Sequence, residues 1–187
     1  MPPGVQPNDL LIAEIAVRGG TATTITAPPG WTLVRRDNRA STIAQAVYRH
    51  LVPVSPPEPS GYTWNFTAGN DAAGAIAAYS GVSTASPVDA SNGQGNASST
   101  NITAPSVTVP SGHASDRLLA LFSIANGSSV STPSGMNQLW SFRAIGFGIG
   151  VAAADVNLSA SGATGNRVAT AATAGVNAGA LIALIPQ

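Results

Sequence analysis

The sequence predicts an all-β protein, a single jelly-roll-like β-sandwich built from two internally related halves. Apolar residues alternate with a period of two in most candidate strands, which is typical of half-buried β-strands. Turn-forming Gly, Pro, Asn and Asp residues separate these strands, and the second half of the chain repeats motifs of the first. Helix is not expected, because glycine interrupts nearly every apolar run, including residues 147–154.

The internal repeat consists of three blocks that return in the same order at nearly one spacing. The first returns after 107 residues and the other two after 105. A chain this rich in Ala, Gly, Ser and Thr also matches itself easily, so composition is the alternative explanation. The paired blocks are Asp9–Val17 with Asp116–Ile124, Pro28–Trp31 with Pro133–Met136, and Gly74–Tyr79 with Gly179–Leu184.

The domain organisation follows from the repeat. Half of a sandwich cannot bury its own apolar face, so we expect residues 9–82 and 116–186 to share one core. Residues 83–115 join the two halves, and the whole sandwich spans 9–187 as a single domain. Residues 1–8 form an extended N-terminal arm rich in proline.

In the first half, Gly19-Gly20 and Pro28–Gly30 separate short β-prone segments, and a polar turn is expected at 36–39. Residues 61–67 place Tyr62, Trp64 and Phe66 on one face, where they would anchor one end of the core. The expected strands or β-segments are 9–18, 21–26, 31–35, 41–52, 61–67 and 72–80.

Before the second half, residues from about 81 to 115 form a long connection that is Ser/Asn/Gly-rich at 91–101 and contains one expected strand, 102–109. Trp140 and Phe142 stand where the first half has smaller residues, as expected for a core shared by unequal copies. The expected strands are 116–125, 137–143, 145–158, 166–173 and 177–185.

Composition indicates an uncharged polar surface. Charged residues make up 9% of the chain, all eight basic residues are Arg, and the formal net charge is zero. Such a surface lacks the charge repulsion that keeps neighbouring molecules apart, which favours a protein that assembles with others. With no cysteine, disulfides are excluded. The N-terminus shows no secretory signal and the apolar runs are too short to span a membrane, so we expect folding in the cytosol.

No catalytic, cofactor-binding or metal-binding residue is predicted, and no cofactor is expected. His50 and His113 lack a nucleophile motif and are interpreted as surface or edge residues. Most acids stand at turns or strand ends. Glu14 is the exception, because it lies in an apolar strand; Arg18, another arginine or solvent would be its partner.

Other candidate sites have simpler interpretations. Asn70-Asp71 and the Asp89–Asn92 segment carry oxygen ligands but no dense calcium-binding loop. The arginines at 35, 36, 39 and 49 are interpreted as a solvated turn, so nucleic-acid binding is not expected. Trp31 and Trp140 would stack sugars if exposed, but burial is the expected role of Trp in a chain with 5% aromatics.

Three blocks resemble a family of Ala/Gly/Thr-rich β-sandwich proteins of bacteriophages and prophages. They are Pro29–Val34, Ala73–Val82 and Pro87–Ala90, and the similarity runs from about residue 9 to 186. The resemblance implies a jelly-roll-like virion component, either a capsid decoration protein or part of a tail or fibre. These motifs are structural, so the resemblance assigns no functional residue.

The expected function is therefore that of a non-enzymatic virion structural protein, a capsid decoration (cement) protein that stabilises the shell. Its expected partners are the major capsid protein or another virion protein and copies of itself, a trimer being one arrangement, with no nucleic acid and no membrane. It would be made in the host cytoplasm and reside in the virion. The alternatives are a carbohydrate- or receptor-binding module of a tail fibre and, third, a glycan-active enzyme, for which paired carboxyls in a groove would be required.

Overall fold

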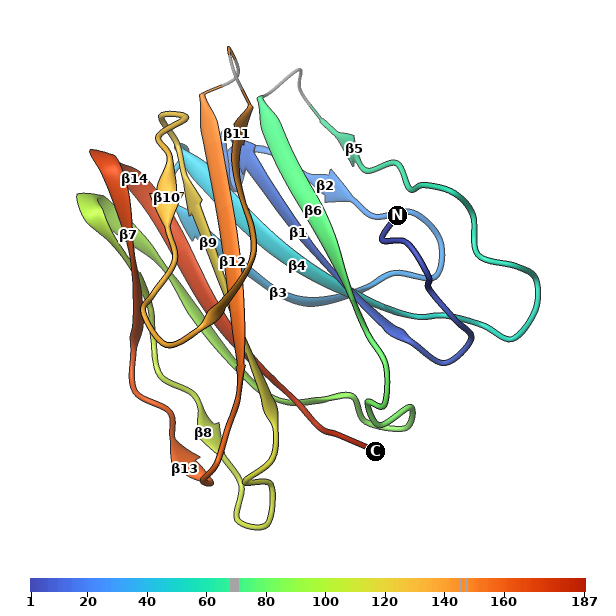
Figure 1. The fold of residues 1–187 in the computed structure, drawn as a ribbon. Coiled ribbons are helices and arrows are strands. Elements are labelled where there is room, and N and C mark those ends of the chain that lie inside the picture. Colours follow the sequence, from blue (N-terminus) through green and yellow to red (C-terminus); the bar gives the residue numbers. More distant parts are fainter. Residues whose placement is uncertain (68–70, 145, 147) are drawn as a thin grey trace.

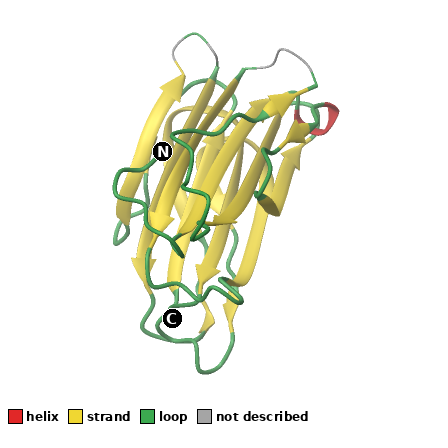
Figure 2. Cartoon of the chain, turned by 90° about the vertical axis from the view of Figure 1, so that its right-hand side faces the viewer, coloured by secondary structure: helices red, strands yellow, loops and turns green. Residues whose placement is uncertain are grey.

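The computed structural model describes residues 1–67, 71–144, 146 and 148–187 and shows two β-sheets packed face to face (Figure 1). Apart from one short 3-10 turn, the regular structure of these residues is all strand (Figure 2), so the predicted all-β sandwich is confirmed. The elements are β1 (Leu10–Arg18), η1 (Gly20–Ala22), β2 (Ile25–Thr26), β3 (Thr32–Arg39), β4 (Ile43–Leu51), β5 (Asn65–Phe66), β6 (Ala72–Tyr79), β7 (Val88–Ala104), β8 (Thr108–Val109), β9 (Arg117–Ile124), β10 (Val130–Ser131), β11 (Asn137–Ala144), β12 (Ile149–Asn157), β13 (Gly162–Ala163) and β14 (Arg167–Leu184).

Each half of the chain supplies one sheet, and the two sheets have the same strand order. The first sheet runs β3-β4-β1-β6. The second runs β11-β12-β9-β14, and both β10 and β7 pair with β14 on its other side. When the four long strands of each half are numbered in chain order, both sheets have the spatial order second, third, first, fourth. A jelly roll is built from Greek keys, whose order is fourth, first, second, third. The jelly-roll part of the prediction is therefore not supported by the connectivity.

Strand pairing in the second half follows that in the first. The short pair Ile25–Phe66 has its counterpart in Val130–Ala171. Both edge hairpins also have a register shift at the same place, between Leu33 and Arg35 in β3 and between Gln138 and Trp140 in β11. Whether the halves arose by duplication stays a prediction.

The hydrophobic interior has three layers. Between the sheets, Leu10 and Ile12 of β1 pack with Leu119 and Leu121 of β9 and with Ile182 of β14. On the outer face of each sheet lies a further cluster, because the connections of the same half fold back over it. In the first half this cluster includes Leu11, Ile15 and Trp31; in the second it includes Phe122, Val107 and Val109. The expected shared core is thus accompanied by a private core in each half.

The joining segment is more ordered than expected. Residues 88–104 form one strand, β7, which pairs along β14, itself continuous through the predicted gap between 173 and 177. β7 also closes one side of the sandwich against β3. A Cβ atom on Gly95 would lie 2.3 Å from the Asn38 carbonyl oxygen, so only glycine permits this approach.

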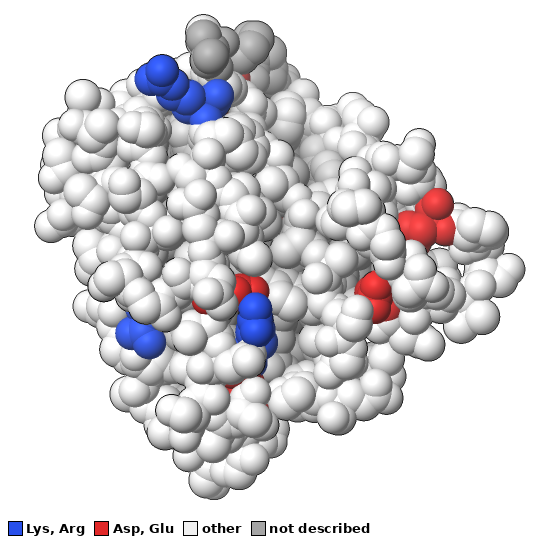
Figure 3. Space-filling view, in the orientation of Figure 1, with Lys and Arg blue, Asp and Glu red and all other residues white. Residues whose placement is uncertain are grey.

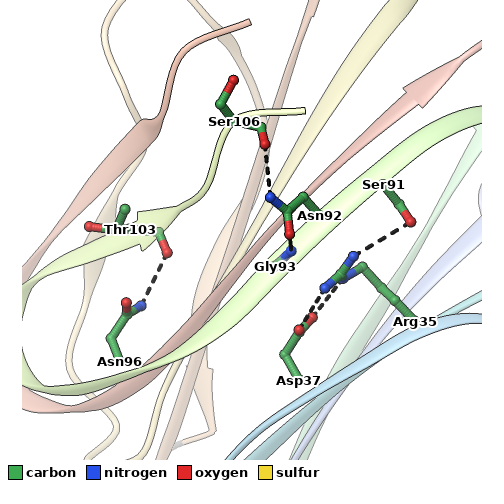
Figure 4. Close-up of polar contacts among 8 residues, drawn as sticks. All are labelled: Arg35, Asp37, Ser91, Asn92, Gly93, Asn96, Thr103 and Ser106. Carbon is green, nitrogen blue, oxygen red and sulfur yellow. Dashed lines mark hydrogen bonds and ion pairs between the residues drawn. The ribbon is translucent and has the colours of Figure 1, made fainter. Parts of the chain in front are cut away.

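The turn predicted at 36–39 lies instead after Arg39, and β3 continues through these residues. Their side chains hold the strand in place. Arg35 donates two 2.7 Å hydrogen bonds to Asp37 (Figure 4), and Arg36 donates to the carbonyls of Gly20 and Thr23. The interpretation of these arginines as a solvated turn is wrong for Arg35 and Arg36.

Some other expected elements are shorter. Of residues 61–67 only β5 is strand, and Tyr62, Trp64 and Phe66 pack, half-buried, on the outer core of the first sheet. The predicted strand 145–158 begins at Ile149, while residues 145 and 147 lie outside the described part of the chain.

The N-terminal arm is held to its own domain. It contains two turns, Val5 packs on the outer core of the first sheet, and the Asn8 N–H donates to the Val52 carbonyl at 2.9 Å. In the described part of the chain no helix is both long and apolar enough to cross a membrane.

Candidate functional site

Most acidic side chains are withdrawn from the surface. Of the eight acids in the sequence, Glu58 and Asp89 have side chains only 11% and 8% exposed. Figure 3 shows one face that is almost free of charge, with isolated Arg and acidic patches. Acidic side chains therefore contribute little to this face of the molecule. The buried acids are Asp9, Glu14, Asp37, Asp116 and Asp155.

One flank of the sandwich is open, between the edge strands β6 and β11. In the described chain β6 pairs only with β1, and β11 only with β12. A groove of about 330 Å³ lies between them and is lined by Ile76, Ala77 and Leu139 among others. Leu139 and Phe142 of β11 are 37% and 42% exposed. This β6–β11 flank combines free backbone hydrogen-bonding groups with exposed apolar side chains.

Polar side chains line one end of the same flank. Arg117 donates a 2.8 Å hydrogen bond to the buried Asp155, which also accepts a bond from the Tyr79 hydroxyl at 3.2 Å. Burial, with the Asp155 charge beside it, raises the pKa of Tyr79. The sequence does not predict this trio, because Tyr79, Arg117 and Asp155 come from three separate strands, β6, β9 and β12.

An aromatic groove lies on the outer face of the first sheet. It has a volume of about 290 Å³ and is lined by Tyr62, Trp64, Phe66 and residues of β6. Trp31 packs edge-on against Trp64, with ring centroids 5.1 Å apart. Trp31 is buried as predicted, at 8% exposed, whereas Tyr62 and Trp64 are half-buried. The groove offers apolar ring edges to a ligand.

His50 lies beside this groove and has both ring nitrogens engaged. Nδ1 is 2.8 Å from the Gly30 carbonyl oxygen, and Nε2 is 3.0 Å from Glu58, which also accepts a hydrogen bond from the Tyr62 hydroxyl. The imidazole stacks on Trp31 at 5.4 Å. His50 thus joins Gly30, Glu58 and Trp31 in one contact network beside the aromatic groove.

Glu14 is fully buried between the sheets. Its carboxyl accepts hydrogen bonds from Gln45 Nε2 at 2.7 Å and from Trp140 Nε1 at 3.1 Å. Burial raises its pKa from 4.5 to about 8. None of the partners suggested by the sequence, Arg18 included, binds it; the Arg18 guanidinium donates instead to the Ala125 carbonyl across the sheets.

A third polar cluster joins Asp89, His113 and Asp116, whose ligand-type atoms lie within 4.8 Å of one another. His113 Nδ1 is 3.1 Å from Asp89 Oδ2. His113, expected at the surface or at an edge, has a side chain that is 37% exposed, while Asp116 is fully buried. Asp89 belongs to the segment considered as a cation site from the sequence; of the other, Asn70-Asp71, Asn70 lies outside the described residues.

Comparison of the chain with protein-family models, curated proteins and solved structures found no match. The function must therefore be argued from the surface and the polar clusters themselves.

Proposed function

We propose that this chain is a non-enzymatic virion structural protein of a bacteriophage, and specifically a capsid decoration protein that binds copies of itself and the shell. The observation that supports this most is the β6–β11 flank. The low surface charge supports it independently, since neighbouring molecules would approach with little electrostatic repulsion.

The edge strand β6 has none of the usual protection against pairing. Natural edge strands are blocked by charged side chains, proline or a bulge. β6 reads AAGAIAAY, with no charge and no proline, and its pairing with β1 is regular from end to end. An unprotected edge beside exposed Leu139 and Phe142 is suited to the addition of a strand or apolar surface from another protein.

The partner is inferred from the chemistry of the flank. Its lining is mainly apolar, and its one arginine, Arg117, is paired with Asp155, so it does not offer the basic surface that nucleic acid requires. A neighbouring β-protein, either a second copy or a capsid subunit, supplies backbone donors and acceptors together with small apolar side chains.

The oligomeric state tests this proposal. Light scattering on the purified chain should give the mass of an oligomer. Ala77→Lys places a charge in the flank groove and should shift the mass to that of a monomer. Ser134→Lys, in an exposed turn that does not line this groove, should not. A monomeric wild-type protein that is also missing from the peptide spectrum of purified virus particles would refute the assignment.

A second candidate function rests on the aromatic groove. The groove is lined by half-exposed Tyr62 and Trp64, whose rings would stack on a sugar ring. Glu58, hydrogen-bonded to Tyr62, would bind the sugar hydroxyls. This would fit a carbohydrate- or receptor-binding module of a tail fibre. Glycan-array binding that is lost in Trp64→Ala would favour it over the decoration protein.

A further inference from the structure

We propose that Asp89, His113 and Asp116 bind one divalent transition-metal ion of the Zn²⁺ type, which fastens the segment joining the two halves to the second sheet.

The three residues come from separate parts of the fold. Asp89 is on β7, His113 is in the turn between β8 and β9, and Asp116 immediately precedes β9. Their ligand-type atoms are within 4.8 Å of one another. A Zn²⁺ ion lies about 2.0–2.2 Å from each ligand atom, so two of its ligand atoms are at most roughly 4 Å apart. Only a small adjustment of side chains is therefore needed to close the site.

The first half of the molecule provides an internal comparison. Asp9 occupies the position equivalent to Asp116: the Asp9 N–H donates to Gln6 O at 3.1 Å, as the Asp116 N–H does to His113 O at 3.3 Å. Likewise the Asp9 carbonyl accepts from Val52 N–H, and that of Asp116 from Leu158 N–H. The two turns therefore have the same backbone arrangement.

The carboxylates of these two turns differ in how they are satisfied. Asp9 Oδ2 accepts a 2.8 Å hydrogen bond from the Gln6 N–H. Asp116 is 0% exposed, yet among the described residues no backbone or side-chain group donates a hydrogen bond to either of its oxygens. In place of Gln6 the second half has His113, and Asp89 approaches from β7, for which the first half has no counterpart. A buried carboxylate left without a donor is costly, and a cation would satisfy it.

The backbone of β7 aims Asp89 at the site. Pairing of β7 with β14 shifts register there, because Ala90 faces Ala183 while Val88 faces Leu184. Asp89 is thus the extra residue of a bulge. Bulges redirect a side chain out of the normal alternation of a strand.

The donor set indicates the class of ion. Ca²⁺ and Mg²⁺ prefer ligand shells made of oxygen alone. An imidazole nitrogen with two carboxylates suits Zn²⁺ and similar transition metals, with water completing the shell.

Zinc titration of the tag-free, chelator-treated full chain tests the site. Calorimetry should show one saturable Zn²⁺ per chain and a rise in melting temperature. Asp89→Asn, His113→Ala and Asp116→Asn should each weaken Zn²⁺ affinity at least about tenfold. Asp9→Asn and His50→Gln are matched controls at the equivalent acid and the other histidine, and should leave the affinity unchanged.

Folding of the variants is checked in the metal-free state. Asp116→Asn removes one of two facing buried acids, so without zinc it should melt at or above the temperature of the wild-type protein. Absence of saturable Zn²⁺ binding, equal affinity in Asp116→Asn and Asp9→Asn, or preference for Ca²⁺ over Zn²⁺ would each overturn the proposal.

Discussion

Trp140 Nε1 donates a 3.1 Å hydrogen bond to Glu14 Oε2 and thereby links the two sheets. Trp140 comes from β11 of the second half and Glu14 from β1 of the first. Apolar side chains surround the pair. A titratable group thus lies where the halves of the sandwich meet.

This position makes stability depend on pH. The Glu14 pKa is about 8 in the folded protein against 4.5 as a free side chain. Between these values the folded state holds a proton that the unfolded state has lost, so stability falls as pH rises, by up to about 1.4 kcal/mol per pH unit. Below pH 4.5 both states are protonated and the effect vanishes. Denaturant unfolding at pH 5, 6, 7 and 8 measures the slope.

Glu14→Gln should remove this contribution and stabilise the protein at pH 7 and above relative to wild type. Asp71→Asn, which changes the net charge equally but not the buried acid, should keep the wild-type slope. The same pH slope in Glu14→Gln and wild type would show that Glu14 is ionised in the folded state.

Gly95 is predicted to be the least replaceable glycine of the β3–β7 contact. A Cβ there would meet Asn38 O at 2.3 Å, and backbone cannot move aside as a side-chain end can. Gly95→Ala should therefore cost about 1–3 kcal/mol of stability. At Gly61 an added Cβ meets nothing within 4 Å, so Gly61→Ala is the matched control and should be neutral. Equal melting temperatures for the two variants would show that β3 and β7 are not tightly apposed.

Local pattern was sufficient to predict the central strands. Apolar residues alternate or cluster strongly in β1, β4 and β9, and residues on both faces of these strands are buried. This pattern predicts a strand at each position. The Ser/Asn/Gly-rich residues 91–101 have weak strand propensity, and they become strand only because β14 lies alongside. Pairing with a distant strand does not require alternation of apolar and polar residues, so the sequence of this segment does not reveal it.

The polar clusters were hidden for the same reason. Glu14 was recognised as an exception, but its partner Trp140 lies in the other half of the chain. Asp116 was visible as the repeat of Asp9, and the replacement of Gln6 by His113 in the equivalent turn was a usable signal. The approach of Asp89 depends on a bulge in β7 that no local motif marks.

Trp64 distinguishes the two candidate functions. Its ring centroid lies 5.1 Å from that of Trp31 and 6.1 Å from that of Tyr48, but it is half-buried, and its Nε1 has no hydrogen-bond partner in the part of the chain that the structure describes. Trp64→Ala should cost about 3 kcal/mol, the low end for loss of a packed aromatic. Phe142→Ala, which removes an aromatic 42% exposed, should change stability far less.

Melting temperature and glycan binding should be measured on the same two variants. If Trp64 is structural, Trp64→Ala melts lower while wild type and both variants show no glycan binding. If the groove binds sugar, Trp64→Ala loses a glycan that the wild-type protein and Phe142→Ala both retain. An unchanged melting temperature together with that loss would overturn the structural role of Trp64 and favour the tail-fibre module, because a ring that contributes only to ligand contact is not needed for folding.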